Sequence, residues 1–373
     1  MTGGPLRVLQ LYPKEDYFTG AAIQLRDLVT GLAGRGHDVV VATRPSEIWS
    51  TKMREAGIPH YPVPMSSEVD LGSVRRLVQI LKSHRIQVVH AQKGKARTLA
   101  MIAGLFVRIP VLVLNRGVSF PLDPFNRLGY TTRRVTAIVA VCESIKHGLV
   151  KQGVDAGKIE VIYSGTDTRR FHPGVDGARI RRELGLADEH FLVTQIGIRS
   201  WKGNDDVLDG IAKIAPRLPR VRLLFVGANE AKAKILREKA AARGIPEIVS
   251  VFLYREDIPE ILRASDVTVD ASYAGLGLTG TLRESLAVGT PVIGTDLEGN
   301  PELVIHGETG LLVKPHDAAG IGEAILTLAT DPERARAMSQ AGRALVEARF
   351  STAVKVERTE ALYRRLLTSR RSA

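Results

Sequence analysis

Short apolar runs alternate with segments of helical periodicity twice along this 373-residue chain, and this repeat is the strongest constraint on its fold. The first round opens with the apolar run LRVLQLYP and continues from Gly20 with AAIQLRDLVTGLAGRGH, where apolar residues recur at helical spacing. The second round opens with FLVTQIGI and closes with GLLVKP. Buried strands that alternate with helices are typical of a parallel sheet covered on both faces. The sequence therefore predicts an α/β protein with two Rossmann-like halves that face each other across a cleft.

The connection SGTDTRRFHPG separates the two rounds and has the Gly and Pro content of a domain linker. We expect a first domain at residues 1–168 and a second domain at residues 169–351. The last segment, about residues 352–373, has an amphipathic helical pattern, and we expect it to pack back on the first domain. Two domains also agree with the chain length, which exceeds that of one ordinary core.

Positive charge is concentrated in the first domain. The whole chain carries a net charge of +12, and residues 1–168 hold 22 Lys and Arg against 13 Asp and Glu. Between Leu71 and Arg134 there are 12 basic residues and one acid, Asp123. Such a block could attract phosphate-bearing partners or an anionic membrane surface, or it could reflect a generally basic proteome. Nucleic acid is not expected, because no aromatic residues alternate with the basic ones to stack on bases.

The same sequence limits the compartment and the cofactors. The single cysteine, Cys142, excludes an internal disulfide and favours a reducing compartment, and its apolar surroundings predict a buried structural thiol. No apolar run approaches the roughly 20 residues of a membrane-spanning helix. We therefore expect a cytoplasmic protein, soluble or peripheral on the inner face of the cytoplasmic membrane. No paired acids or His/Cys cluster indicates a metal, and no cofactor is expected.

Candidate residues in the second half follow strands, where parallel sheets bind ligands at the carboxyl edge. Arg199 and Lys202, in GIRSWKG, could neutralise a diphosphate leaving group. The loop GLGLTG could bring backbone N–H groups to a phosphate. It leads into a helix whose first turn is expected to carry Glu284, a candidate acceptor of ribose hydroxyls or a simple helix-end charge. The loop residues assigned to donor binding are Gly277, Leu278, Thr279 and Gly280.

The first half offers a second group of candidates at the corresponding edge. Gly20 begins a helix beside the expected cleft and is assigned to donor binding. Basic residues begin another helix although cations there oppose the helix dipole, which indicates an anionic ligand. A lone histidine such as His90 is more often structural. The candidates for acceptor or sugar binding are His90, Lys93, Lys95, Asn115 and Arg116, with Arg97 also in the basic helix start.

The order of these segments resembles the retaining glycosyltransferases of family 4, which have the GT-B fold. The resemblance rests on Gly20, VIYSGTDTRRFHP, RSWKG, RESLAVGTPVIGTD, GNPELVIHGETGLLV and the terminal helix, and it covers nearly the whole chain. It implies that Arg199 and Lys202 bind the donor diphosphate and act in catalysis, and that Glu284 binds the ribose.

The sequence departs from the family pattern at two positions. Leu276 stands where the family has the first Glu of its Glu-seven-residues-Glu motif, and Arg116 stands where a His is usual. The resemblance still implies sugar transfer from a nucleotide sugar with retention, to an anionic acceptor such as a lipid-linked or lipopolysaccharide-type glycan of the cell envelope. Two alternatives remain, a sugar-nucleotide epimerase and a catalytically inactive sugar-nucleotide binder, for which Leu276 is the main argument.

Overall fold

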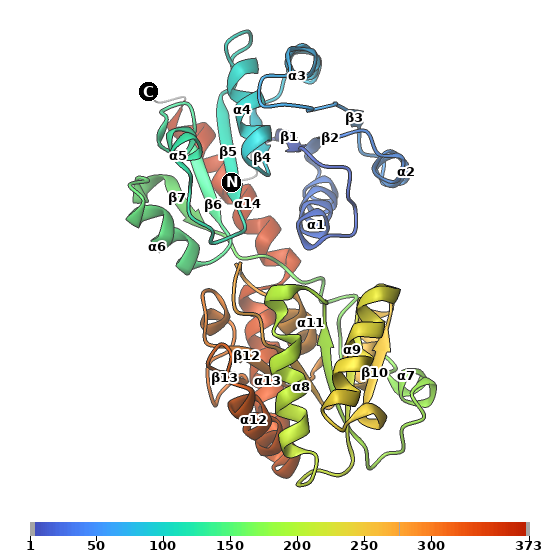
Figure 1. Ribbon diagram of the computed structural model, residues 1–373. Coiled ribbons are helices and arrows are strands. Elements are labelled where there is room, and N and C mark those ends of the chain that lie inside the picture. Colours follow the sequence, from blue (N-terminus) through green and yellow to red (C-terminus); the bar gives the residue numbers. More distant parts are fainter. Residues whose placement is uncertain (1–3, 276, 371–373) are drawn as a thin grey trace. The chain divides into compact units, whose positions relative to one another are not determined.

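The computed structural model describes residues 4–275 and 277–370, and the chain divides into two compact units (Figure 1). Unit 1 runs to Gly165 and is completed by the residues from Thr352 onward, whereas unit 2 comprises Thr166–Ser351. The first boundary thus lies at Gly165, slightly before the expected residue 168, and the second falls where it was expected. Leu276 lies outside the described residues.

Unit 1 contains a seven-stranded sheet in the order β3-β2-β1-β4-β5-β6-β7, with every pairing parallel. Its strands read as apolar runs because helices cover both faces of the sheet. The strands are β1 (Arg7–Tyr12), β2 (Asp38–Thr43), β3 (His60–Pro62), β4 (Val88–Ala91), β5 (Val111–Arg116), β6 (Ala137–Ala140) and β7 (Ile159–Val161). The helices are α1 (Gly20–Gly34), α2 (Glu47–Glu55), α3 (Leu71–Ser83), α4 (Gly94–Ala103), α5 (Pro124–Thr131), α6 (Glu143–Lys151) and α14 (Thr352–Ser369).

The sequence pattern did not predict α2, β3 or α5. Helix α2 is held by tertiary contacts: Trp49 is fully buried, packs edge-on against Tyr17, and donates its indole N–H to the Asp16 carbonyl oxygen at 2.8 Å. Strand β3 is a short edge strand that contains Pro62, which an edge position tolerates because no partner needs its missing N–H. Such elements depend on neighbours that are distant in sequence.

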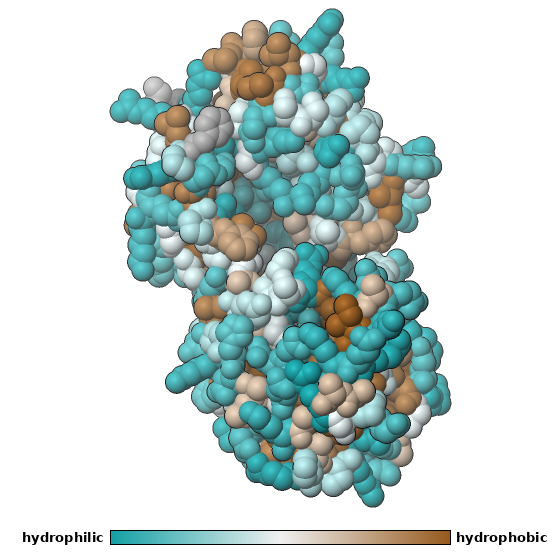
Figure 2. Space-filling model, viewed as in Figure 1, coloured by the Kyte–Doolittle hydropathy of each residue, from teal (hydrophilic) through white to brown (hydrophobic). Residues whose placement is uncertain are grey.

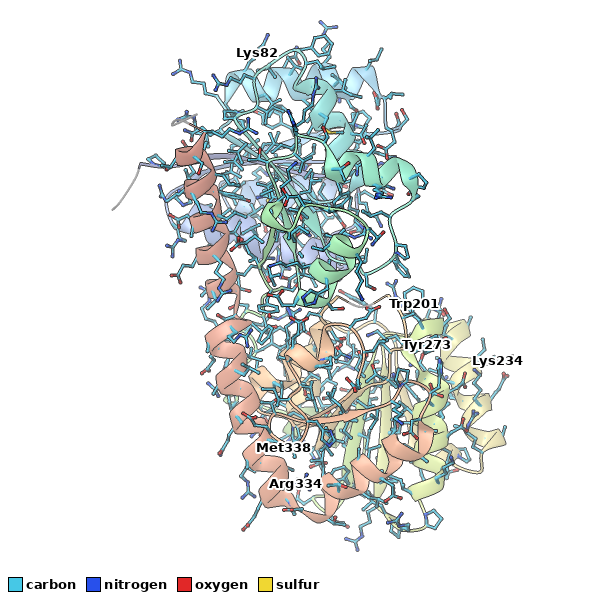
Figure 3. The ribbon with its side chains drawn as sticks, turned by 90° about the vertical axis from the view of Figure 1, so that its left-hand side faces the viewer. Lys82, Trp201, Lys234, Tyr273, Arg334 and Met338 are labelled. Carbon is cyan, nitrogen blue, oxygen red and sulfur yellow. The ribbon has the colours of Figure 1, made fainter. Side chains whose placement is uncertain are left out.

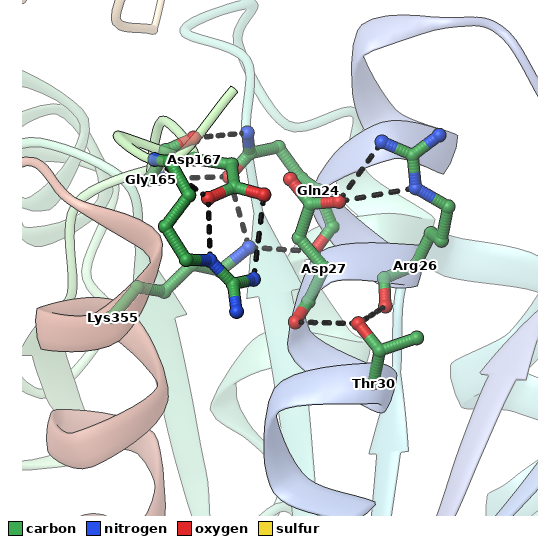
Figure 4. A network of polar contacts seen from close by, with 8 residues as sticks. Gln24, Arg26, Asp27, Thr30, Gly165, Asp167 and Lys355 are labelled. Atoms are coloured by element: carbon green, nitrogen blue, oxygen red, sulfur yellow. Dashed lines mark hydrogen bonds and ion pairs between the residues drawn. The ribbon is translucent and has the colours of Figure 1, made fainter. Parts of the chain in front are cut away.

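Helix α14 packs on α1, although more than 300 residues separate them in the chain. A Cβ at Gly31 would lie 2.4 Å from Val356 Cγ2, so the glycine permits the close approach of the two helices. Lys355 Nζ donates to the Gln24 carbonyl oxygen at 2.7 Å, and the Gln24 side chain in turn bonds both backbone groups of Gly165 (Figure 4). The expected C-terminal helix therefore forms and belongs to unit 1.

Unit 2 contains a six-stranded parallel sheet in the order β10-β9-β8-β11-β12-β13. Apolar clusters lie on both faces, one with α8, α9 and α12 and the other with α7 and α10. The strands are β8 (Phe191–Ile196), β9 (Val221–Val226), β10 (Val249–Phe252), β11 (Val267–Asp270), β12 (Val292–Thr295) and β13 (Leu311–Val313). The helices are α7 (Ala178–Glu183), α8 (Asn204–Ile214), α9 (Glu230–Ala242), α10 (Ile258–Ala264), α11 (Gly280–Val288), α12 (Ala318–Thr330) and α13 (Pro332–Arg349).

Both sheets reverse their strand order beside the first strand, between β1 and β4 in unit 1 and between β8 and β11 in unit 2. In doubly wound sheets, ligands bind at the carboxyl ends of the strands at this switch point. The two Rossmann-like halves predicted from the alternation are thus confirmed. Among the described residues, no helix is both long enough and apolar enough to cross a membrane.

Candidate functional site

An ion pair occupies the switch point of unit 2. Lys202 follows β8 and Asp270 ends β11, and Lys202 Nζ lies 2.7 Å from Asp270 Oδ2. The Asp270 side chain is 1% exposed and the Lys202 side chain 16% exposed. Asp270 Oδ1 also accepts the backbone N–H of Ser272 at 3.1 Å. The ammonium group of Lys202 is therefore held at the carboxyl edge of the sheet, where an anionic ligand would bind.

Gly203 brings the loop that carries Lys202 against the end of β11. It adopts φ +63°, and a Cβ at this position would lie 2.2 Å from the Ala271 carbonyl oxygen. Gln195 Nε2 donates to the Lys202 carbonyl oxygen at 2.6 Å, and Asn204 Nδ2 donates to Gln195 Oε1 at 3.0 Å. The backbone of Lys202 is thus hydrogen-bonded to a side chain of β8, and the next residue, Gly203, lies against the residue that follows β11.

Arg199 lies elsewhere on the same loop. It is exposed, and its guanidinium lies 5.5 Å from the centre of the Trp201 ring. It lines a hollow of about 430 Å³ together with Lys232 and Tyr273, and Lys202 does not line this hollow. Figure 3 shows Trp201 and Tyr273 close together, and the Tyr273 N–H donates to the Trp201 carbonyl oxygen at 2.9 Å. The structure therefore places the two predicted cations on one loop but does not bring them to one point.

The predicted donor loop leads into α11, as expected, but Glu284 is not in the first turn. The helix begins at Gly280, so Glu284 is its fifth residue. A Cβ at Gly280 would lie 3.7 Å from Glu284 Oε1, because helical side chains tilt toward the N-terminus. Glu284 is half-buried and its carboxylate reaches back to the start of the helix. Glu284 therefore lies in the second turn of α11 and not in the first, but its side chain still lies beside the donor loop.

Side chains of the donor loop point inward and join a buried network that the sequence did not reveal. Leu278 and Thr279 are 8% and 6% exposed. Thr279 Oγ1 donates to Asn300 Oδ1 at 3.0 Å, and Asn300 Nδ2 donates to the Thr295 carbonyl oxygen at 3.1 Å. Asn300 is fully buried, and its side-chain amide links the donor loop to the end of β12. The network fixes the loop backbone of residues 277–280 relative to β12.

In unit 1, His90 is buried rather than presented at the sheet edge. It is 2% exposed, and its Nδ1 forms a 2.6 Å hydrogen bond with the hydroxyl of Tyr363 on α14. Burial, together with the positive charge of Lys355, lowers the pKa of His90 to about 3, so the ring is neutral at pH 7. Because Tyr363 also accepts a hydrogen bond from Gln10 Nε2 at 3.1 Å, His90 belongs to the packing of α14. His90 is therefore buried rather than exposed at the sheet edge, its Nε2 has no hydrogen-bond partner among the described residues, and its role in acceptor binding stays a prediction.

The other predicted residues of unit 1 lie on three elements. Gly20 is the first residue of α1 and is exposed, with open space where a Cβ would be. Lys93 is the exposed N-cap residue of α4, and Lys95 Nζ donates to the Ser66 carbonyl oxygen at 2.9 Å. Asn115 and Arg116 end β5, and Arg116 donates to the Phe120 carbonyl oxygen. These positions share the carboxyl edge of the sheet.

The structure adds two acids that sequence reasoning missed. Asp270 was detectable as an acid at the end of the apolar run VTVDAS. Asp16 follows β1 and accepts hydrogen bonds from the Tyr12 hydroxyl at 2.5 Å and the Thr19 hydroxyl at 2.7 Å, with Lys14 Nζ at 3.7 Å. Nothing in the loop PKEDYFTG distinguished Asp16 from its acidic neighbour. Within residues 4–275 and 277–370, no group of three or more His, Cys, Asp or Glu is placed to hold a metal ion.

Comparisons with known proteins account for both units. Residues 18–170 match the family described as Glycosyltransferase Family 4, and residues 176–345 match the family described as Glycosyl transferases group 1. The chain is 30% identical over 311 residues to the alpha-maltose-1-phosphate synthase of Mycolicibacterium smegmatis, covering 75% of this chain and 79% of that protein. It is 25% identical over 363 residues to the N-acetyl-alpha-D-glucosaminyl L-malate synthase of Bacillus anthracis, covering 92% and 93%.

A solved structure agrees with these sequence matches. The structure of Anabaena Alr3699/HepE in complex with UDP superposes with a TM-score of 0.85 at 22% identity, covering 96% of this chain and 99% of that one. The fold is therefore GT-B. Together with the two family matches, these findings show that the chain is an enzyme that belongs to the family 4 glycosyltransferases.

Proposed function

We propose that this glycosyltransferase binds the diphosphate of its nucleotide-sugar donor at Lys202, at the switch point of unit 2. The observation that carries the proposal is the ammonium group fixed by Asp270 at 2.7 Å. Arg199 on the same loop and the backbone amides of residues 277–280 supply further positive potential. Glu284 accepts hydrogen bonds from the ribose. The UDP in the Anabaena structure, a protein of the same fold, supports a nucleotide donor.

The proposed reaction is sugar transfer with retention at the anomeric carbon. The bond between that carbon and the diphosphate breaks through an oxocarbenium-like state, as in glycoside hydrolysis. Negative charge then grows on the leaving diphosphate, so a cation already in place lowers the barrier without reorganising. The chain's own part in this step is to hold Lys202 at the sheet edge and keep the donor loop rigid through Asn300.

The proposed acceptor is anionic and binds at unit 1, through Lys93, Lys95, Asn115 and Arg116. The basic block around these residues supports this assignment, since it contains 12 basic residues and one acid. Relatives named for a maltose 1-phosphate and for an L-malate product also support an acidic acceptor. We propose a lipid-linked or cell-envelope glycan, modified at the cytoplasmic face of the membrane.

Glu284→Ala tests the donor assignment. Loss of the charged acceptor should weaken nucleoside diphosphate binding by roughly 1.5–3 kcal/mol, or about 10- to 150-fold in Kd by calorimetry. The matched control is Glu308→Ala, which removes an exposed carboxylate of unit 2. The wild type should also prefer a ribonucleotide to its 2′-deoxy form, and Glu284→Ala should lose that preference. A preference that survives in Glu284→Ala would exclude a ribose contact.

Lys93→Glu combined with Lys95→Glu tests the acceptor assignment. Reversal of two charges should raise the acceptor KM at least about tenfold and leave nucleotide Kd unchanged, because the two ligands contact different units. The control for net charge is Lys82→Glu combined with Arg75→Glu, because these two exposed residues of α3 change the charge by the same amount (Lys82 is labelled in Figure 3). An equal loss of nucleotide binding would contradict the assignment of the acceptor to unit 1 and of the donor to unit 2. Conversion of a nucleotide sugar without any acceptor would instead identify an epimerase, and donor binding without transfer an inactive binder.

A further inference from the structure

A largely apolar groove of about 390 Å³ runs between α4 and α5 in unit 1. Its walls include Met101 and Ile102 near the end of α4, Leu105 just beyond it, and Leu128 on α5. Leu105 and Leu128 are 59% and 69% exposed, which is unusual for two large apolar side chains that share one hollow. Figure 2 shows apolar side chains gathered at the end of unit 1 where the α4–β5 connection of Figure 1 lies.

A buried cation lies at one end of this groove. Arg97, which also lines it, is 2% exposed and forms no ion pair within the described part of the chain. Its guanidinium donates to the carbonyl and side-chain oxygens of Asn126 at 3.3 and 3.1 Å, and its Nε has no hydrogen-bond partner. Burial lowers the pKa of Arg97. The Tyr130 ring, 5.5 Å from the guanidinium, and the carboxylates of Glu68 and Asp123 stabilise this charge in part, whereas the buried Nε still has no acceptor among the residues that the structure describes.

The guanidinium of Arg97 can occupy its position only because residue 129 is a glycine, which has no Cβ. A Cβ at Gly129 on α5 would lie 2.3 Å from Arg97 Cζ. Gly129 has no left-handed backbone that would otherwise explain a glycine. The space above Gly129 is therefore filled by the guanidinium of Arg97 itself.

The groove has a direction that fits a linear amphiphile. Arg97 lies in the first half of α4, which begins directly after β4 at the carboxyl edge of the sheet, beside Lys93. Leu105 lies eight residues later, or about 12 Å along a helix axis. Arg97 thus lines the groove near the proposed acceptor residues, and Leu105 lines it at the exposed connection after α4. The exposed Arg134, whose guanidinium donates to the Met101 carbonyl oxygen at 3.2 Å, adds a second cation to the lining.

We propose that the groove between α4 and α5 binds the hydrocarbon chain of a lipid phosphate, with the phosphate toward Arg97. This proposal rests on the proposed acceptor class and identifies the binding site for the lipid part of that acceptor. Phosphate supplies an acceptor for the unpartnered Nε of Arg97, and the apolar walls remove the first part of the hydrocarbon chain from water. Leu105 and Leu128, exposed in the free protein, become covered.

The test measures binding of decyl phosphate to the full chain without any nucleotide sugar, with decanol and inorganic phosphate for comparison. The wild type should bind decyl phosphate at least about tenfold more tightly than either comparison compound, because each lacks one half of the recognition. Leu105→Ser should weaken decyl phosphate binding about tenfold. Phe106→Ser is the matched control: Phe106 is 64% exposed but does not line the groove, so its loss should change binding less than about twofold.

Two further variants address the charged end. Arg97→Met should remove the preference for decyl phosphate over decanol, and Gly129→Ala should weaken decyl phosphate binding by displacing the guanidinium. Circular dichroism and Tm verify that both variants fold, and Leu105→Ser tests the groove even if they do not. Failure of the wild type to bind decyl phosphate would overturn the proposal. The proposal would also be overturned if Leu105→Ser and Phe106→Ser weakened binding to vesicles containing anionic lipid equally, because equal losses indicate a flat membrane-docking surface and not a groove. Donor binding is measured separately, so a wrong donor assignment would leave this result unaffected.

Discussion

Lys202→Ala is expected to lower turnover by roughly 10²-fold and to destabilise the protein by about 3–5 kcal/mol. Turnover falls because a preorganised cation is lost from the diphosphate site. Stability falls because Asp270, 1% exposed, is left as a buried carboxylate without its ion-pair partner. The measurements are steady-state kinetics with saturating donor and denaturant unfolding of the same preparation.

A second substitution separates these two effects. Lys202→Met combined with Asp270→Leu replaces the pair with apolar side chains of similar volume, which is often neutral for stability. We expect the double variant to regain most of the free energy of unfolding and none of the turnover. If turnover also returned, the charge of Lys202 would serve only the fold, and the proposed mechanism would be wrong.

Gly203→Ala is expected to destabilise unit 2 by at least about 3 kcal/mol and to abolish nucleotide binding. A methyl group there would lie 2.2 Å from the Ala271 carbonyl oxygen, so the loop of Lys202 must move away from β11. Part of the cost is left-handed backbone, roughly 1 kcal/mol for a non-glycine residue. Thermal unfolding and calorimetric titration with a nucleoside diphosphate measure the two effects.

Gly185→Ala is the matched control, because Gly185 has φ +65° and open space around the position of a Cβ. It should cost only the backbone contribution and leave nucleotide binding intact. Similar losses in the two variants would show that the contact with Ala271 is not what positions the Lys202 loop.

The alternation of strands and helices could be predicted because each element carries its own local pattern. The run VLVLN is buried on both faces and reads as a strand, and AAIQLRDLVTGLAG carries the spacing of a helix with one buried side. The strand order of a doubly wound sheet then follows from right-handed crossovers. In contrast, α2 depends on where Trp49 packs, which no local pattern contains.

The candidate site was only partly predictable for a related reason. The sequence shows that Lys202 follows a strand, β8. The ion-pair partner of Lys202, Asp270, lies on the neighbouring strand β11, 68 residues further along the chain, and the sequence does not show which strands are neighbours. His90 read as an edge residue because it ends an apolar run, yet α14 covers it. Leu276 is a departure from the family motif that the sequence alone reveals.

The return of the chain to unit 1 has a consequence for synthesis. Unit 1 includes α14, which is synthesised after unit 2, and α14 supplies Tyr363 to the interior and Val356 to the surface of α1. Unit 2 is complete in sequence before α14 exists, and its two ends are joined by a 2.8 Å hydrogen bond from the Thr166 N–H to the Phe350 carbonyl oxygen. Unit 2 can therefore fold while one side of α1 is still uncovered. A nascent chain that lost α14 would contain a complete unit 2 attached to an incomplete unit 1, the kind of product that cellular quality control degrades.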